Sequence, residues 1–332
     1  MPSYFGVVLM GLSISIQGMS SRPSSRVNIS KTNLAHAVVF PILISLALMI
    51  FCSPVRSQEA AVGAKVSAVE LLRRAVNGEL QAQAKDHSHW MYEVRSEESG
   101  ERKIKWVIET SAGDVDRLES VNGRRISTAQ AEQETQRIEG LVHTPEAQQE
   151  QRHSQEEDAR KTEQMFRLMP DAVLARYGAR EGGLVEIIFK PNPNFHPSSR
   201  EGVVFHAMAG RIWINEKENR LAEIEGHLIR EVKFGGGFLG YLEQGGEFHV
   251  RQIETAPGHW EVSLLRVNMQ GKALFFKTIS VQQNELRSEF QRVGDNITLA
   301  EAAEDLQRRC TVQTAALPRA DLSTQISQQM KR

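Results

Sequence analysis

The feature that most constrains the fold is a series of segments with a two-residue period, which fills the C-terminal half of the chain. Gly or Asn turns separate these segments, and no helices alternate with them. Consecutive strands joined by short turns pair antiparallel, whereas a doubly wound parallel sheet alternates strands with helices. The pattern therefore predicts an antiparallel sheet, with strands near residues 184–189, 203–215, 220–234, 246–255, 259–268, 273–283 and 285–293.

A meander of three more strands is predicted nearer to the N-terminus. Residues 90–94 and 104–108 alternate aromatic or aliphatic side chains with polar ones. The third segment, 114–121, ends at Asn122-Gly123, a strong signal for a two-residue hairpin turn.

Helices are predicted before the first strand and after the last strand along the chain, so the fold class is α+β. Residues 67–84 place apolar side chains at helical spacing, and Ser67 with Glu70 fits a capping box. Residues 299–309 form a short closing helix, and 311–332 read as a disordered tail.

The segment near residues 127–178 is predicted to be a helical insertion into a single domain. It is rich in Gln, Glu and Arg, with few apolar residues. Thr144 followed by Pro145 combines an N-cap with a proline at the first helical position, which divides the segment into two helices. A third short helix is expected from Pro170 to Gly178.

The N-terminus carries an export signal. The apolar run from Ala35 to Phe51 follows basic residues and ends in a short polar segment, the order that a secretory signal peptide requires. Cleavage before Gln58 makes residues 1–57 the signal peptide and 58–310 the exported domain. We therefore expect the product in the periplasm of a Gram-negative bacterium, with no stable membrane anchor after cleavage.

Three alternatives to this signal stay open. Cys52 could be the lipidated residue of a lipoprotein signal, although the bulky Phe51 precedes it where a small residue is needed. If it is not cleaved, the apolar run of roughly 17 residues is just long enough to span the inner membrane, and the domain would be anchored there and face the periplasm. A second apolar stretch, Tyr4 to Ile16, would form a hairpin of two helices with the first, but we favour a translation start at Met19, which gives an ordinary signal peptide.

Charge and cysteine content exclude two classes of protein. Four of the 40 basic residues and none of the 41 acidic residues precede Glu59, so removal of residues 1–57 leaves a net charge of −5. This mild acidity argues against a nucleic-acid partner. Cys310 would be the one cysteine left after cleavage, so the exported domain has no internal disulfide.

No motif in the chain predicts catalysis or a cofactor. Gly235 to Gly240 satisfies G-x-G-x-x-G, but no helix can follow, so a turn between antiparallel strands is favoured. The pair His87 and His89 lacks a third metal ligand at a recognisable spacing. Glu223 and Glu225 alternate as acids do on a solvated strand face. We expect a protein that is not an enzyme and that binds neither metal nor cofactor.

The strands are rich in aromatic residues, which suggests an apolar cavity if a curved sheet encloses more apolar surface than its helices fill. The candidate ligand-binding residues are Trp90, Trp106, Trp213, Trp260 and Phe275.

The segment from Gly210 to Val293 resembles the outer-membrane lipoprotein-sorting superfamily of Gram-negative bacteria, the LolA/LolB and RseB-like proteins. The pattern G-x-x-W-I, a charged turn and R-L-x-x-I-x-G is carried by Gly210, Trp213, Ile214, Arg220, Leu221, Ile224 and Gly226. The resemblance implies a curved antiparallel half-barrel with helices packed in or across its concave face, and a lipid or lipoprotein acyl chain as ligand. The alternatives are a periplasmic interaction or sensor module of the same fold that contacts an envelope protein and, third, an envelope hydrolase.

Overall fold

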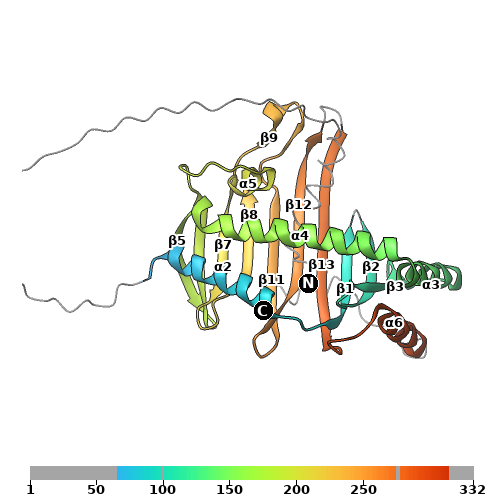
Figure 1. The fold of residues 1–332 in the computed structure, drawn as a ribbon. Helices are drawn as coiled ribbons and strands as arrows, with labels where there is room; N and C mark the ends of the chain where they lie inside the picture. The colour runs from blue at the N-terminus through green and yellow to red at the C-terminus, as the bar shows by residue number, and fades with distance from the viewer. Residues whose placement is uncertain (1–65, 99, 274–276, 314–332) are drawn as a thin grey trace, which may run out of the picture. The chain divides into compact units, whose positions relative to one another are not determined.

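The computed structural model describes residues 66–98, 100–273 and 277–313 of the chain. From Ser67 onward these residues belong to one compact unit. They form a large curved antiparallel sheet of 13 strands, not closed into a barrel, together with five helices (Figure 1). The predicted fold class, α+β with a curved antiparallel sheet, is confirmed.

In the middle of the sheet, a strand from the N-terminal part of the described chain pairs with a strand from its C-terminal part. Its order is β4 (Arg124–Arg125), β3 (Val115–Val121), β2 (Glu101–Ile108), β1 (Trp90–Glu98), β13 (Lys277–Arg292), β12 (His259–Ala273), β11 (Glu247–Ala256), β8 (Arg220–Leu228), β7 (Met208–Asn215), β6 (Leu184–Pro191) and β5 (Val173–Glu181). A small hairpin of β9 (Val232–Phe234) and β10 (Gly240–Leu242) pairs with β12. The predicted glycine-rich turn is confirmed, because Gly235–Gly237 connects these two antiparallel strands.

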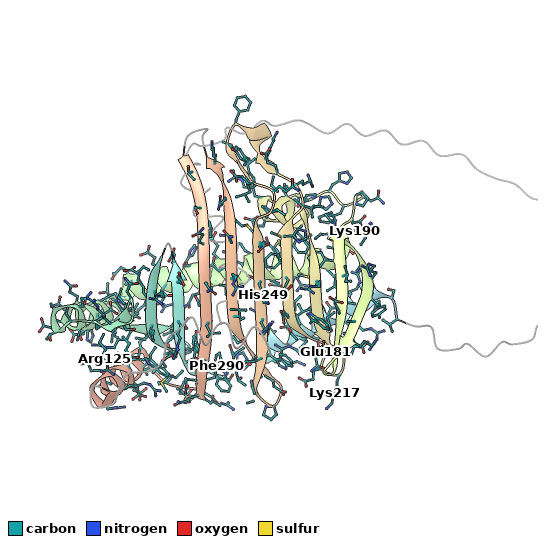
Figure 2. The ribbon with its side chains drawn as sticks, turned by 180° about the vertical axis from the view of Figure 1, so that it is seen from behind. Arg125, Glu181, Lys190, Lys217, His249 and Phe290 are labelled. Atoms are coloured by element: carbon teal, nitrogen blue, oxygen red, sulfur yellow. The ribbon has the colours of Figure 1, made fainter. Side chains whose placement is uncertain are left out.

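The two faces of the sheet differ in chemistry. Directly paired residues share a face, and one such row across five strands is apolar and buried: Ile187, Ile212, Ile224, Val250 and Leu265. The neighbouring rows on the other face carry charged side chains, among them Glu186, Glu223, Glu225, Arg211, His249, Arg251 and Arg266. Figure 1 shows helices α2 (Ala68–Lys85) and α4 (Pro145–Ala172) crossing the sheet, and Figure 2 shows the reverse face with His249 near its middle.

Local signals place the helix ends. Ser67 caps α2, with its Oγ accepting a hydrogen bond from the Glu70 backbone N–H at 3.2 Å. The helix α3 (Thr128–His143) ends where predicted, and Pro145 opens α4. Of the two remaining helices, α5 is Arg200–Phe205 and α6 is Leu299–Gln313. Residues 311–313, predicted as tail, belong to α6.

The predicted third helix from Pro170 to Gly178 is wrong. Helix α4 continues through Pro170 to Ala172, because a proline in the last turn removes only one hydrogen bond near a frayed end. Strand β5 then begins at Val173 and pairs with β6, so Gly178 lies in a strand. A Cβ at Gly178 would overlap the Glu186 carboxylate, which accepts a hydrogen bond from the Ala179 backbone N–H at 2.9 Å.

Strand lengths also differ from the prediction. Residues 203–205 belong to α5 rather than to a strand, and β8 ends at Leu228 before the separate strand β9. Three predicted strands over 259–293 are two long ones. The expected break at Asn284 is absent because Asn284 pairs with Glu97 of β1 on one side and Arg266 of β12 on the other.

The predicted signal peptide, residues 1–57, and residues 314–332 of the predicted tail lie outside the described residues. Within the described part of the chain, the helices are too short or too polar to cross a membrane.

Candidate functional site

A polar cleft of about 650 Å³ lies at one end of the sheet. We use the name polar cleft for the space between the α2–β1 connection, the β2–β3 turn, the start of β12 and the β13–α6 connection. Gln155 of α4 also lines it. The side chains with titratable or nucleophilic chemistry include Asp86, Ser88, His89, Glu109, Asp114 and His259.

The α2–β1 connection is held by a side-chain turn. Asp86 Oδ1 accepts hydrogen bonds from the Ser88 backbone N–H at 2.9 Å and from Ser88 Oγ at 2.7 Å. This turn brings the end of the first helix to the first strand and carries His89 into the wall of the cleft.

Glu109 occupies the end of the β1–β2 pair. Its backbone N–H donates to the Trp90 carbonyl at 3.0 Å, and its Oε2 accepts from the Trp90 backbone N–H at 3.1 Å. The residue is 3% exposed, and its second carboxyl oxygen, Oε1, has no hydrogen-bond partner. Buried polar atoms without a partner are uncommon in folded proteins and call for an explanation.

Burial raises the pKa values of three carboxyl groups in or beside the polar cleft, whereas hydrogen bonds from Ser88 and His259 outweigh burial and lower the pKa of Asp86. Burial, and next the charges of Glu261 and Asp114, hold the pKa of Glu109 well above its usual range. Burial raises the pKa of Asp114 to about 6. Burial also raises the pKa of Glu261 to about 7, although Arg287 opposes this shift. These groups therefore retain protons at pH values where exposed carboxyl groups are ionised.

The combination of Asp86, Ser88 and His259 does not form a hydrolytic triad. Asp86 Oδ2 lies 3.0 Å from His259 Nδ1, and Ser88 Oγ lies 3.5 Å from the same nitrogen. A serine nucleophile needs the opposite ring nitrogen, Nε2, as its base while the acid holds Nδ1. Ser88 Oγ instead donates to Asp86 and accepts from Trp90 Nε1 at 2.9 Å.

A different cluster lies on the charged face of the sheet (Figure 2). His249 Nε2 lies 2.6 Å from Glu223 Oε1 and 3.6 Å from Glu225 Oε1, close enough for a shared metal ion. Both carboxylates are already paired, however: Arg251 Nε lies 3.0 Å from Glu223 and Arg211 Nη2 lies 2.6 Å from Glu225. The two acids therefore belong to a half-buried ion-pair network, and a cation would have to displace two guanidinium groups.

The structure separates the two N-terminal tryptophans that the sequence suggested for one cavity. Trp106 pairs with Glu93, whereas Trp90 lies on the opposite face of the same two strands. Trp90 borders the polar cleft, with its ring 6.2 Å from that of His259. Trp106 packs in a cluster with α3 and α6, beneath the guanidinium of Arg309 at 3.6 Å.

The other candidates lie elsewhere. Trp213 pairs with Glu186 and Glu223 on the charged face. Trp260 is half-buried, donates from Nε1 to Glu218 at 2.8 Å and lies 5.7 Å from the Arg220 guanidinium. Phe275 lies outside the described residues.

The buried carboxyl groups in and beside the polar cleft were not predicted from the sequence. A signal exists in the sequence, because Glu109 lies two residues after the buried Val107 and Glu261 two residues before the buried Ser263, and both acids are buried as well. Acids at inward positions of a strand are uncommon unless they have a function or a buried partner.

Comparison with known proteins gives little further information. No protein-family model matches the chain, and no curated protein matches it. One solved structure that matches is the crystal structure of a DUF1329 family protein from Desulfovibrio piger. It is 10% identical, and the match covers 70% of this chain and 96% of that chain with a TM-score of 0.26. A likeness of this strength carries no argument about function.

Proposed function

We propose that this protein is a non-catalytic binding protein of the bacterial cell envelope, which holds a lipid or a lipoprotein acyl chain against the apolar face of its sheet. The observation that supports the proposal is the apolar row that crosses five strands from Ile187 to Leu265. Each methylene removed from water contributes about 0.8 kcal/mol, so an acyl chain binds such a face without a polar anchor.

Helix α4 is suited to cover such a ligand. Within the described residues its main backbone neighbours are α2, α3, α5 and the edge strand β5, rather than the central strands β12 and β13. Three of its buried apolar side chains are Met165, Phe166 and Met169. Methionine side chains are unbranched and polarizable, so they adapt to ligands of different shape.

The test is native mass spectrometry of the full-length gene product, recovered from the envelope fraction of a Gram-negative host. We expect a co-purifying lipid, and we expect the delipidated protein to bind a fluorescent fatty acid. Val250→Gln, on the apolar face, should weaken this binding. Arg251→Gln, the next residue on the charged face, is the matched control and should not. Protein that carries no lipid and binds no fatty acid would exclude the proposal.

A second candidate function is capture of an envelope protein by the helical insertion. Ile138 is the one buried residue of the 16 in α3, which leaves most of that helix available to a partner. Charge reversal at the exposed residues Glu132 and Glu139 should then abolish cross-linking to a partner in the envelope while lipid binding persists. Unchanged cross-linking would exclude this use of α3.

A further inference from the structure

We propose that the polar cleft binds a ligand through a primary ammonium group, which Glu109 and Asp114 recognise. The inference does not depend on acyl-chain binding, because it concerns a charged group and a different part of the fold. An amine-headed lipid would satisfy both proposals, and a small free amine would satisfy only this one.

The first observation is the unpaired carboxyl oxygen of Glu109. The side chain lines the polar cleft, is 97% buried and uses only Oε2 in a hydrogen bond within the protein. An ammonium group would give Oε1 the charged donor that it lacks, and hydrogen bonds between ionised partners are about twice as strong as neutral ones.

A second buried atom in the same cleft also lacks a partner. His89 Nδ1 has no hydrogen-bond partner among the described residues. Burial lowers the pKa of His89, so the ring is uncharged at neutral pH, and its Nε2–H tautomer presents Nδ1 as an acceptor. A primary ammonium carries three N–H donors and no acceptor. Glu109 Oε1 and His89 Nδ1 are therefore two buried acceptors that line the polar cleft without a hydrogen-bond partner among the described residues.

The ligand is an organic cation rather than a bare metal ion. Among the described residues, the one group of His, Asp and Glu ligand atoms that lie within 4.8 Å of one another is Glu223, Glu225 and His249, on the charged face. The acceptors of the polar cleft do not converge in this way. Its volume of about 650 Å³ is that of a site for a small molecule or headgroup.

The charges around the cleft determine how binding depends on pH. The charges of Asp114 and Glu261 act on Glu109, and Asp86 and Asp295 are further acidic groups that line the cleft. The basic groups that line the cleft are Lys85, His87, His89, His259 and Arg292. The charge of Arg287 also opposes the rise in the pKa values of Asp114 and Glu261. Because burial raises the pKa values of Glu109 and Asp114, the empty site holds protons that an ammonium ion must displace. Affinity should therefore rise as the pH rises from 5.5 to 8.

Isothermal titration of the purified full chain with ethanolamine tests the inference, and choline is the matched probe because its methylated nitrogen has no N–H donor. We expect ethanolamine to bind at least tenfold more tightly than choline, with proton release and with tighter binding at pH 8 than at pH 5.5. Lysophosphatidylethanolamine and lysophosphatidylcholine, below their micellar concentrations, form the lipid arm of the experiment. Discrimination only between the two lysolipids would identify the source as a lipid headgroup.

Glu109→Gln keeps an acceptor for the Trp90 backbone N–H but removes the charge, and it should weaken ethanolamine binding at least tenfold. Glu223→Gln, an acid on the charged face, should leave binding unchanged. If Glu109→Gln fails to fold, Asp114→Asn takes its place with the same expectation. Equal binding of amine and trimethylammonium probes, or no binding of any of the four, would overturn the inference. If the unmodified chain binds a fatty acid but none of the amine probes, only the ammonium site is overturned.

Discussion

Arg220 and Glu79 form a buried two-point ion pair that joins helix α2 to strand β8. Arg220 Nε lies 2.9 Å from Glu79 Oε1, and Nη2 lies 3.1 Å from Oε2. Glu79 Oε1 also accepts a hydrogen bond from the Leu221 backbone N–H at 2.7 Å. Both residues are buried, with Arg220 9% exposed and Glu79 7% exposed. The pair fixes the helix on the sheet.

Glu79→Ala should reduce the free energy of unfolding by about 3–5 kcal/mol, because it leaves the Arg220 charge and the Leu221 N–H buried without partners. Arg73→Ala removes an exposed ion pair between the same helix and Asp171, and should cost at most about 1 kcal/mol. Urea denaturation of both variants measures the difference. Equal losses would contradict a structural role for the buried pair.

Gly210→Ala should destabilise the protein by roughly 1–3 kcal/mol. Gly210 pairs with Gly226 at the β7–β8 contact, and an added Cβ would overlap the Glu225 carbonyl oxygen. Gly140→Ala is the control in α3, where no atom lies near the new methyl group, and it should stabilise by about 0.5–1 kcal/mol through lower unfolded-state entropy. Thermal unfolding should therefore shift in opposite directions for the two variants.

Stability should fall as the pH rises from about 4.5 to about 7, because the folded state favours the protonated form of Glu261. Burial raises its pKa from 4.5 to about 7. The folded state then binds more protons than the unfolded state within this window, which lowers the free energy of unfolding by up to about 3 kcal/mol at about 1.4 kcal/mol per pKa unit. Glu261→Gln should reduce the slope measured by urea denaturation at pH 5, 6, 7 and 8, while Glu109 and Asp114, whose pKa values burial also raises, maintain the remainder.

Glu223→Gln provides a control of opposite sign. Burial acts to raise the pKa of Glu223, but hydrogen bonds from His249 and Arg251 outweigh it and hold the pKa at about 2. The stability from this carboxylate is present above its unfolded pKa and is lost as the pH falls toward 2. Glu223→Gln should therefore remove part of the acid-side decline and leave the slope between pH 5 and 8 unchanged.

Trp106→Ala should cost about 3–5 kcal/mol, since Trp106 is fully buried between β2, α3 and α6. Trp213 is half-buried on the charged face, so Trp213→Ala should reduce the free energy of unfolding clearly less than Trp106→Ala does. Neither variant should alter the affinity of the folded protein for an acyl probe, because neither tryptophan lies on the face of the apolar row. Guanidinium denaturation measures the stability, and fluorescent fatty-acid titration measures the affinity. A large loss of affinity in Trp213→Ala would contradict the proposal, because it would place the ligand on the charged face instead of the apolar face.

The structural features that depend on only a few neighbouring residues were predicted correctly from the sequence. Ser67 caps α2 because its hydroxyl reaches a backbone N–H three residues later. Asn122 and Gly123 form the β3–β4 turn because both accept positive φ, at 50° and 77°. The Pro145 start of α4 is local in the same sense. Conversely, Pro170 misled the prediction, because tertiary pairing of β5 with β6 and the last turn of α4 decide that boundary.

The sequence by itself determined the antiparallel character of the sheet, its two chemically different faces and most helix ends, because these follow from periods and caps within a single segment. Only the tertiary structure decided which strands are neighbours. Strand β1 pairs with β13, from which most of the chain separates it in sequence. This pairing places Trp90 near His259, and Glu109 near the charge of Glu261. A two-residue period specifies the face on which a side chain lies, but not the distant segment that lies opposite. The buried carboxyl groups of the polar cleft therefore became visible only when the strands were placed side by side.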